Sequence, residues 1–270
     1  MNEKRYPWRT SIIKVEPGKM ILRGYKVEDL IENLTFGEAV YLILKGELPQ
    51  ENHGKMMEAV LVSTIDFGIG APSIATARIA SSCGNFITTS VVAGLCSFGG
   101  TYHGGAVEGC VKMLRDGVQR MVDEGKKLDE MARIIVEEHK TLRRRVPGYG
   151  HPIHHERDPR VEKLFELAET YRVAGNHITL CKAVGRALDE AVGRHLTINP
   201  DAAIAAVGLD LGFDHRLIQG LNVISRCAGL IAHAHEEMMR EKPFRGVGKD
   251  QILYDGPPER DLEAHSPHRN

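Results

Sequence analysis

Apolar residues recur at helical spacing through almost the whole chain after residue 24. Side chains three and four positions apart share one face of an α-helix, so this pattern predicts a series of amphipathic helices. The expected helices cover residues 27–32, 35–45, 54–65, 72–82, 86–98, 104–124, 128–142, 159–172, 178–195, 200–212 and 216–240. Strands do not alternate with these helices, and the sequence shows no internal repeat. The expected fold class is therefore mainly α.

Three segments depart from the amphipathic pattern. Residues 11–15 and 20–23 flank a turn that contains Pro17 and Gly18, which predicts a short N-terminal β-hairpin. The segment Phe86–Phe98 is mostly apolar all round, which predicts a helix that is buried on every side. The tail 257–270 begins with two prolines and carries mixed charges, so we expect it to be disordered.

The composition argues against several classes of protein. The 35 Lys and Arg residues nearly balance the 36 Asp and Glu residues, so nothing points to nucleic acid as a partner. No window approaches the roughly 18 consecutive apolar residues of a membrane span, and the polar start is unlike a secretory signal. The cysteines lack metal-binding spacing, so we expect buried thiols in a reducing cytoplasm. They are Cys83, Cys96, Cys110, Cys181 and Cys227.

The most informative segment runs from Val146 to Arg160. Its loop contains a proline and two glycines and leads directly into His151. Glycine allows unusual backbone angles and the close approach of a ligand, so this segment has the character of a shaped binding loop. Asp158 and Pro159 are typical of an N-cap and the first residue of a helix. The junction thus combines His151, which can exchange a proton near neutral pH, with the Arg160 guanidinium, which can bind a carboxylate.

Two further polar residues lie at predicted helix starts. His103 precedes two glycines and a long helix. Asp201 follows Asn199 and Pro200, which are expected to be the N-cap and first residue of another helix. The positive end of that helix favours the ionised form of Asp201, so we expect it to stay a carboxylate base even in an apolar pocket.

Each of these segments also has a purely structural alternative. His-Gly-Gly can be a tight turn, Asn-Pro-Asp is an ordinary helix start, and His151 could simply be a capped loop histidine. His151, His154 and His155 could indicate a metal, but no carboxylate or cysteine lies at a recognisable ligand spacing, and we expect none. The basic run 143–145 is either a solvated helix end or a group that holds phosphates.

The combination of these motifs, in this order, resembles the citrate synthase family over nearly the whole chain. The family's motifs correspond to Leu22–Leu30, Tyr41–Pro49, His103–Ala106, Val146–His151, Asp158–Arg160, Asn199–Asp201 and Ser225–Gly229. The chain is shorter than ordinary citrate synthases, because it lacks most of the helices between Pro49 and the middle of the large domain. In that respect it resembles citryl-CoA lyase and the C-terminal module of ATP-citrate lyase.

The resemblance implies a role for each matching residue. Asp201 would exchange the proton on the carbon beside the thioester, and His103 would hydrogen-bond the thioester oxygen. His151 would serve the carbonyl or hydroxyl oxygen of the oxo-acid half. Arg160 and Arg226 would bind substrate carboxylates. The adenine-binding loop for coenzyme A would be formed by Val146, Pro147, Gly148, Tyr149 and Gly150.

The chain departs from the family at two places. The family has a histidine that touches the oxo-acid, and Phe67 stands there instead. Phenylalanine offers no hydrogen bond, so a less polar oxo-acid becomes conceivable as the cognate ligand. The family also completes its site with an arginine from the partner subunit. Arg245 and Lys249 are the candidates for that role, with Arg245 preferred.

The resemblance predicts a two-lobed, mainly α fold in which residues 1–105 and 212–270 form the large lobe and 106–211 the small lobe. It implies a homodimer or higher homo-oligomer that cleaves citryl-CoA, or a close 3-hydroxy-acyl-CoA relative, to acetyl-CoA and oxaloacetate. The coenzyme A thioester would be substrate, with no permanently bound cofactor. One alternative is a compact citrate or 2-methylcitrate synthase that condenses an acyl-CoA with a 2-oxo acid. Another is a non-catalytic protein that binds coenzyme A.

Overall fold

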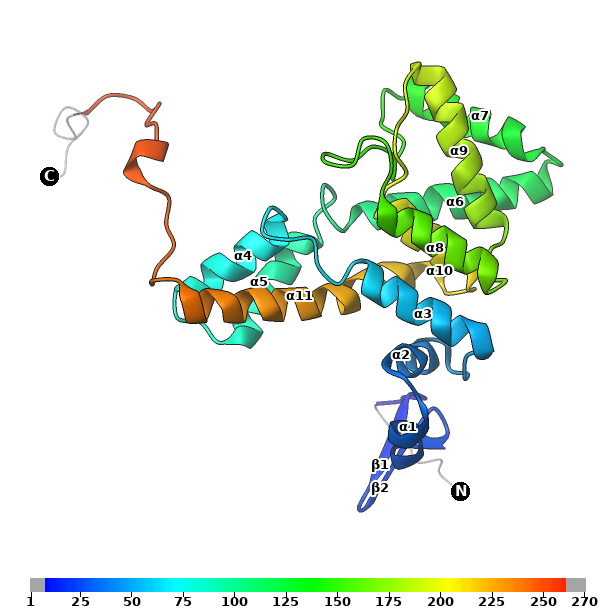
Figure 1. Cartoon of the computed structure of the whole chain (residues 1–270), viewed down its shortest axis with the longest axis horizontal. Helices are drawn as coiled ribbons and strands as arrows, with labels where there is room; N and C mark the ends of the chain where they lie inside the picture. The colour runs from blue at the N-terminus through cyan, green and yellow to red at the C-terminus, as the bar shows by residue number, and fades with distance from the viewer. Residues whose placement is uncertain (1–7, 261–270) are drawn as a thin grey trace, which may run out of the picture.

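The computed structural model describes residues 8–260 (Figure 1). The strands are β1 (Ile13–Glu16), β2 (Lys19–Leu22) and β3 (Tyr25–Lys26). The helices are α1 (Val27–Asn33), α2 (Phe36–Lys45), α3 (Glu51–Ser63), α4 (Pro72–Ser82), α5 (Ile87–Phe98), α6 (Ala106–Asp123), α7 (Leu128–Thr141), α8 (Pro159–Thr170), α9 (Asn176–Val192), α10 (Pro200–Asp210) and α11 (Ile218–Arg240), with 3-10 turns at His215–Leu217 and Lys249–Gln251. The mainly α prediction is confirmed, and the expected helix ends differ from the observed ones by at most three residues.

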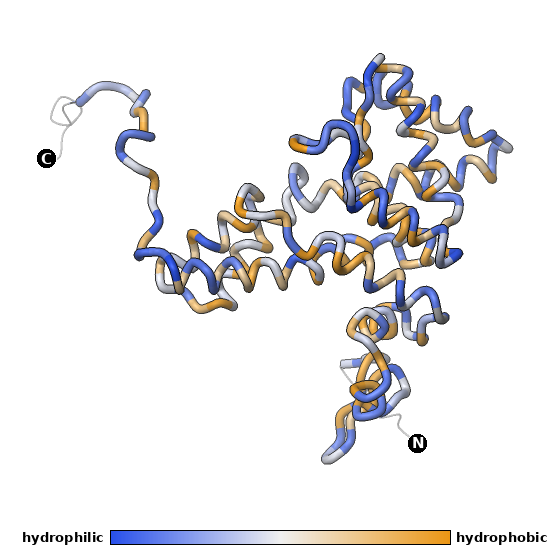
Figure 2. Tube along the Cα trace, viewed as in Figure 1, coloured by the Kyte–Doolittle hydropathy of each residue, from blue (hydrophilic) through white to orange (hydrophobic). Residues whose placement is uncertain are grey.

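The N-terminal hairpin carries one more strand than expected. β1 pairs with β2 in antiparallel register, with Ile13 opposite Leu22, and β3 then pairs with the other edge of β2. The third strand is short and leads straight into α1, so its alternation is too brief to be seen in the sequence. Along most of the helices that follow, hydrophobic and hydrophilic residues alternate in short stretches, as amphipathic packing requires (Figure 2).

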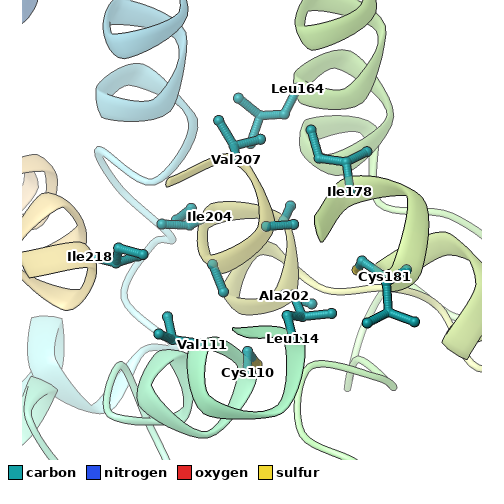
Figure 3. Packing of buried hydrophobic residues seen from close by; sticks show 14 of the residues in the cluster. Cys110, Val111, Leu114, Leu164, Ile178, Cys181, Ala202, Ile204, Val207 and Ile218 are labelled. Atoms are coloured by element: carbon teal, nitrogen blue, oxygen red, sulfur yellow. The ribbon is translucent and has the colours of Figure 1, made fainter. Parts of the chain in front are cut away.

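Helix α10 lies at the centre of the main hydrophobic core (Figure 3). It packs against α6, α8, α9 and α11, and every residue from Ala202 to Gly208 is buried. Four of those seven residues are alanines, and small side chains allow the surrounding helices to approach closely. At Gly208 a Cβ atom would lie 3.1 Å from the Ile218 side chain. This packing fixes the helix axis and therefore the position of its N-terminus, where Asp201 lies.

Helices α4 and α5 pack against the long helix α11 around a second, smaller buried cluster (Figure 1). The prediction that Phe86–Phe98 is buried on every side is wrong for this chain. Only Ser90, Gly94 and Phe98 are buried within α5, whereas Phe86 is 83% and Val92 59% exposed. One face of α5 packs on α4 and α11, whereas apolar side chains on its other face, such as Val92, are exposed.

The cysteines are also less uniformly buried than expected. Cys110 and Cys181 lie in the core, but Cys83 and Cys96 are exposed and Cys227 is intermediate. Cys83 caps the end of α4, and Cys96 lies on the outer side of α5.

Beyond α11 the chain continues to residue 260 as an almost fully exposed arm that runs away from the helices (Figure 1). The first residues of the predicted tail, 257–260, belong to this arm, whereas 261–270 lie outside the described residues. Within residues 8–260, no helix combines the length and the apolarity needed to cross a membrane. The division into lobes at residues 105 and 212 stays a prediction.

Candidate active site

All the sequence-predicted site residues except Arg245 border one cavity of about 690 Å³. Its wall is formed by the loop before α6, the loop 145–152, the starts of α8 and α10, and the first half of α11. His103, His151, Arg160, Asp201, Arg226 and residues 146–150 all line it. Segments as far apart in sequence as His103 and Arg226 therefore meet at one place.

His103 is held by the glycines that follow it and by Ser73. A Cβ atom on Gly105 would lie 2.7 Å from the Gly100 carbonyl oxygen, so the turn requires glycine there. The Nε2 atom of His103 lies 2.9 Å from Ser73 Oγ and 3.4 Å from the Ser73 backbone nitrogen, which can only donate. Nε2 is thus the acceptor and Nδ1 carries the proton of the neutral ring. Burial, and secondarily Arg226, lowers the pKa of His103, which favours this neutral donor.

The loop before His151 is hydrogen-bonded to the start of α10. The Gly150 N–H donates to the Thr197 carbonyl at 2.7 Å, and the Asn199 N–H donates to the Gly148 carbonyl at 2.9 Å. Gly148 has a φ of 87°, and a Cβ atom there would lie 2.5 Å from the Ala202 side chain. The glycine is therefore required both by the backbone angle and by the close packing of the loop on α10.

The hydrogen bonds of His151 define its tautomer. Its Nδ1 atom accepts from the backbone N–H groups of Ile153 at 3.1 Å and His154 at 2.9 Å. The proton of the neutral ring is then on Nε2, which lies 3.9 Å from Asp158 Oδ2. Burial lowers the pKa of His151; Asp158 acts in the opposite direction but does not outweigh it. His151 is thus a neutral hydrogen-bond donor near pH 7.

Arg160 is fixed by Asp158, the N-cap of α8, as the sequence predicts. The Asp158 side chain accepts from the Arg160 backbone N–H at 3.0 Å, and from Nε and Nη2 of its guanidinium at 2.9 and 2.6 Å. Burial acts to raise the pKa of Asp158, but the hydrogen bonds and charge of Arg160 outweigh it, and the pKa lies below its usual value. Asp158 therefore stays ionised and orients a cation at the cavity wall.

Asp201 lies in the first turn of α10, and Asn199 is its N-cap as predicted. The Asn199 Oδ1 atom accepts from the backbone N–H groups of Asp201 at 3.0 Å and Ala202 at 3.4 Å. The expectation that the helix end keeps Asp201 ionised is wrong. Burial raises the pKa of Asp201 to about 7, although Arg160 and Arg226 act to lower it. The desolvation of this carboxyl outweighs the favourable charges, so Asp201 can both give and take a proton near neutrality.

Arg226 is buried in the cavity wall with unused hydrogen-bonding capacity. Its side chain is only 5% exposed, and its Nε and Nη1 atoms have no hydrogen-bond partner among the described residues. The guanidinium lies 5.2 Å from the centroid of the Phe98 ring, and the Phe98 and His103 rings are nearly perpendicular with their centroids 5.0 Å apart. A buried guanidinium with unpaired N–H groups at a cavity wall is suited to binding a carboxylate.

Two contributors to the site were not identified from the sequence. Ser73 orients His103 from the start of α4, and no motif in the sequence distinguishes it. Asn222 lines the cavity from α11 and is buried. It precedes Arg226 by four residues, and this spacing places both on one helix face. The spacing is the signal that could have identified Asn222.

His151, His154 and Asp158 form a compact group in which one potential ligand atom from each lies within 4.8 Å of the others. The sequence shows no carboxylate at a recognisable ligand spacing from these histidines, yet the structure brings Asp158 beside them. Sequence spacing could not show it, because the loop folds back on itself to bring Asp158 under His151. Both oxygens of Asp158 already accept hydrogen bonds from Arg160. A metal would have to displace that pairing, so the absence of a metal from the site stays our prediction.

A second cavity, of about 810 Å³, adjoins the first and shares the loop 145–152 with it. Its lining is strongly basic and comes from α7, the end of α9 and the loops that follow them. The cationic or potentially cationic residues there include His139, Lys140, Arg144, Arg145, Arg194 and His195. Two of the three arginines in the basic run 143–145 thus line a cavity.

Arg245, the preferred candidate for a site residue from the partner subunit, lies elsewhere in its own chain. Its Nε and Nη2 atoms donate to the buried Glu237 carboxylate at 2.8 and 3.0 Å. Glu237 also accepts from Arg78 at 2.6 Å. This network anchors the beginning of the C-terminal arm to α4 and α11.

Comparison with known proteins identifies the class. Residues 49–246 match the family model for the citrate synthase C-terminal domain. Because the match covers most of the chain, the protein belongs to the citrate synthase family. Among curated relatives, the peroxisomal citrate synthase 1 of Arabidopsis thaliana is 30% identical over 193 residues, which are 68% of this chain and 36% of the relative. Citrate synthase 2 of Bacillus subtilis is 26% identical over 83% of this chain and 58% of its own length. The chain thus spans roughly two fifths to three fifths of the length of these two relatives.

Solved structures give a more specific similarity. The citryl-CoA lyase of Hydrogenobacter thermophilus is 38% identical, covers 97% of this chain and 100% of its own, and superposes with a TM-score of 0.86. An ATP citrate lyase from Methanothrix soehngenii, solved with citrate and coenzyme A, covers 95% of this chain and 43% of its own at a TM-score of 0.83. With 22% identity, that second similarity shows the shared fold. The predicted citrate synthase-like fold is confirmed.

Proposed function

We propose that this protein is a citryl-CoA lyase, which cleaves citryl-CoA to acetyl-CoA and oxaloacetate. The observation that carries the proposal is the end-to-end similarity to a citryl-CoA lyase of equal extent, at 38% identity. The cavity supports it, because two neutral histidines, a carboxyl with a pKa of about 7 and two arginines converge there. Cleavage of a hydroxy acid thioester requires proton donors and acceptors on opposite sides of the breaking bond.

In this proposal the bond between the α-carbon of the thioester and the hydroxyl-bearing carbon breaks as the tertiary hydroxyl becomes a ketone. The hydroxyl proton passes to His151, and the bonding electrons move onto the thioester to give an enolate. The Nδ1–H of His103 stabilises the enolate oxygen by a hydrogen bond. Protonated Asp201 then delivers its proton to the carbon, which completes the acetyl group. Because one proton moves to His151 and one leaves Asp201, exchange with solvent restores both residues.

The tautomer of His151 in this structure bears on that cycle. With Nδ1 accepting two backbone N–H groups, Nε2 carries the proton and is ready to donate to a ketone oxygen. To accept a hydroxyl proton at Nε2, the ring must move its own proton to Nδ1. We infer that the segment containing Ile153 and His154 releases Nδ1 when citryl-CoA binds. Asp158, at 3.9 Å, would then stabilise the imidazolium.

We propose that coenzyme A extends from the catalytic cavity into the basic one, across residues 146–150. The two cavities share this loop, so a molecule with its thioester beside His103 can continue over the loop backbone. Coenzyme A carries a diphosphate and a 3′-phosphate, and the basic cavity offers Lys140, Arg144 and Arg194. This assignment favours the phosphate-holding alternative for Arg144 and Arg145.

We further propose a cytoplasmic homodimer or higher homo-oligomer. The apolar side chains of α5 that point away from α4 and α11, and the exposed arm with Phe244 and Leu253, are surfaces that a second copy would cover. Arg245 or Lys249 on that arm would complete the partner's site. Closure of the two proposed lobes, 1–105 with 212–270 against 106–211, would exclude water from it.

A coupled assay on the purified protein tests the proposed reaction. Oxaloacetate released from citryl-CoA is followed through malate dehydrogenase and NADH, and loss of the thioester is followed separately. A lyase releases oxaloacetate and retains the thioester as acetyl-CoA. Citrate and free coenzyme A without oxaloacetate would show a compact citrate synthase instead, whereas binding of coenzyme A without either product would show a non-catalytic protein.

A further inference from the structure

Asn222 has an unsatisfied polar group in the wall of the catalytic cavity. Its side chain is 3% exposed, and its Oδ1 atom is buried without a hydrogen-bond partner among the described residues. An unpaired buried amide is destabilising, and native proteins pair such groups with protein, water or a ligand. Because Asn222 lines the cavity, the missing partner belongs to whatever fills it.

The polar groups next to Asn222 in sequence and space are already paired with one another. Ser225 Oγ donates to the Leu61 carbonyl at 2.5 Å, and the Thr64 hydroxyl donates to Ser225 Oγ at 3.1 Å. These bonds join α11 to the end of α3 and use up the hydroxyl donors there. Asn222 therefore stands apart from the network that holds its own helix in place.

Arg226, one helical turn further along α11, has the same property. Its Nε and Nη1 atoms are buried and unpaired, so two consecutive turns of one helix present unused polar groups to one cavity. When no anion occupies the cavity, the positive charge of Arg226 favours the orientation of the Asn222 amide in which the oxygen faces the guanidinium. A half-turn of the amide about its last side-chain bond exchanges oxygen for NH₂ without changing the shape of the side chain. The amide NH₂ then lies one helical turn from the guanidinium, and a carboxylate can accept hydrogen bonds from both groups.

We propose that Asn222 is a substrate-binding residue that donates a hydrogen bond to the same substrate carboxylate that Arg226 binds. The ligand class is the dicarboxylic four-carbon half of the substrate, so this inference rests on the proposed function. Asn222 would thereby supply a polar contact in a pocket where Phe67 provides none. It would set specificity for oxo-acids with a carboxylate at this position over less polar ones.

Calorimetry with two ligands tests the assignment separately from turnover. Oxaloacetate or citrate reports the dicarboxylic half of the site, and coenzyme A reports the other half. Asn222→Leu keeps the side-chain volume and removes the amide, and should weaken oxaloacetate binding and raise KM for citryl-CoA about tenfold. Asn222→Asp keeps the shape but places a negative charge against the carboxylate, and should weaken both by about a hundredfold. Binding of coenzyme A should stay within about twofold of the wild-type protein in each case.

Gln219→Leu is the matched control, because it removes an amide from the same helix outside both cavities. It should leave oxaloacetate binding unchanged. Equal oxaloacetate binding by wild type and Asn222→Leu would overturn the inference, and so would tighter binding by Asn222→Asp, which would show that the group accepts a hydrogen bond. A wild-type protein that binds neither oxaloacetate nor citrate and leaves citryl-CoA intact would overturn the proposed function itself. Retained binding of coenzyme A shows in every case that the variant is folded.

Discussion

The Arg160 guanidinium lies 5.0 Å from the centroid of the Phe67 ring. Asp158 holds the same guanidinium from its edge through two hydrogen bonds, so the cation is fixed in both plane and position. The edge of the Phe67 ring also contacts His151, at a centroid distance of 5.5 Å. Phe67 thus supports two polar site residues by packing, and cation–π attraction contributes to the position of Arg160.

Replacing Phe67 by leucine should therefore weaken catalysis without unfolding the protein. Leucine fills much of the space but has no aromatic face for Arg160, and a partly desolvated cation–π contact contributes about 0.5–2 kcal/mol. We expect kcat/KM for citryl-CoA cleavage to fall roughly 2- to 30-fold, as measured by oxaloacetate release. Phe67→Tyr preserves the aromatic face and should retain most of the activity. Equal losses in the two variants would show that the ring does not act through its face.

The pH dependence of cleavage should follow Asp201. Cleavage needs the protonated carboxyl, and the pKa of about 7 means that this form is lost as the pH rises through 7. His151 is already in its neutral form there, because burial places its pKa below the ordinary value of 6.5. We expect kcat/KM for citryl-CoA to fall above pH 7, and the reverse condensation to gain as the pH rises through the same range. A cleavage profile that is flat between pH 6 and 9 would contradict the role of Asp201.

Asp201→Asn should abolish proton exchange at the acetyl-CoA methyl group and also stabilise the fold at alkaline pH. The folded chain holds a proton on Asp201 up to about pH 7, whereas the unfolded chain releases it near the ordinary pKa of 3.8. The free energy of unfolding of the wild type therefore decreases as the pH rises from about 4 to 7, and the loss is complete above 7. The asparagine variant carries no ionisable group at this position, so its free energy of unfolding does not show this decrease.

Thermal unfolding at several pH values measures this effect. At pH 8 we expect the variant to be more stable than the wild type by on the order of 2 kcal/mol. The difference should shrink as the pH is lowered and vanish below about pH 4, where both states of the wild type are protonated. A difference that is the same at pH 4 and pH 8 would mean that packing, not ionisation, separates the two proteins.

The basic run before the binding loop offers a matched pair of variants. Arg144 lines the basic cavity, whereas the neighbouring Arg143 lines neither cavity. If the cavity holds the phosphates of coenzyme A, Arg144→Ala should weaken coenzyme A binding about tenfold, and Arg143→Ala should change it little. Repeating the titration with 3′-dephospho-coenzyme A shows which phosphate is involved. Equal effects of both alanine variants would indicate a general charge effect in place of a specific contact.

Helices α5 and α10 show what a hydrophobic sequence pattern predicts and what it leaves open. Helix α5 is apolar all round, yet much of it is exposed in the single chain. Helix α10, with its alanines and a glycine, is the one that is buried at the centre. A hydrophobic pattern favours the removal of a helix from water, but it does not say which surface of the protein the helix packs against. Small side chains at the crossing of several helices decide which one can occupy the centre.

Local chemistry alone determined much of this protein. The caps Asp158 and Asn199 and the glycine loop before His151 follow from short-range geometry, and they predict the helix starts. The order of the polar motifs carries the resemblance to the citrate synthase family, and that resemblance predicts the residues of the site. Only the tertiary structure decided which charges and polar groups share the cavity. The pKa of Asp201 and the unpaired amide of Asn222 depend on desolvation by segments that are distant in sequence, and neither effect is visible along the chain.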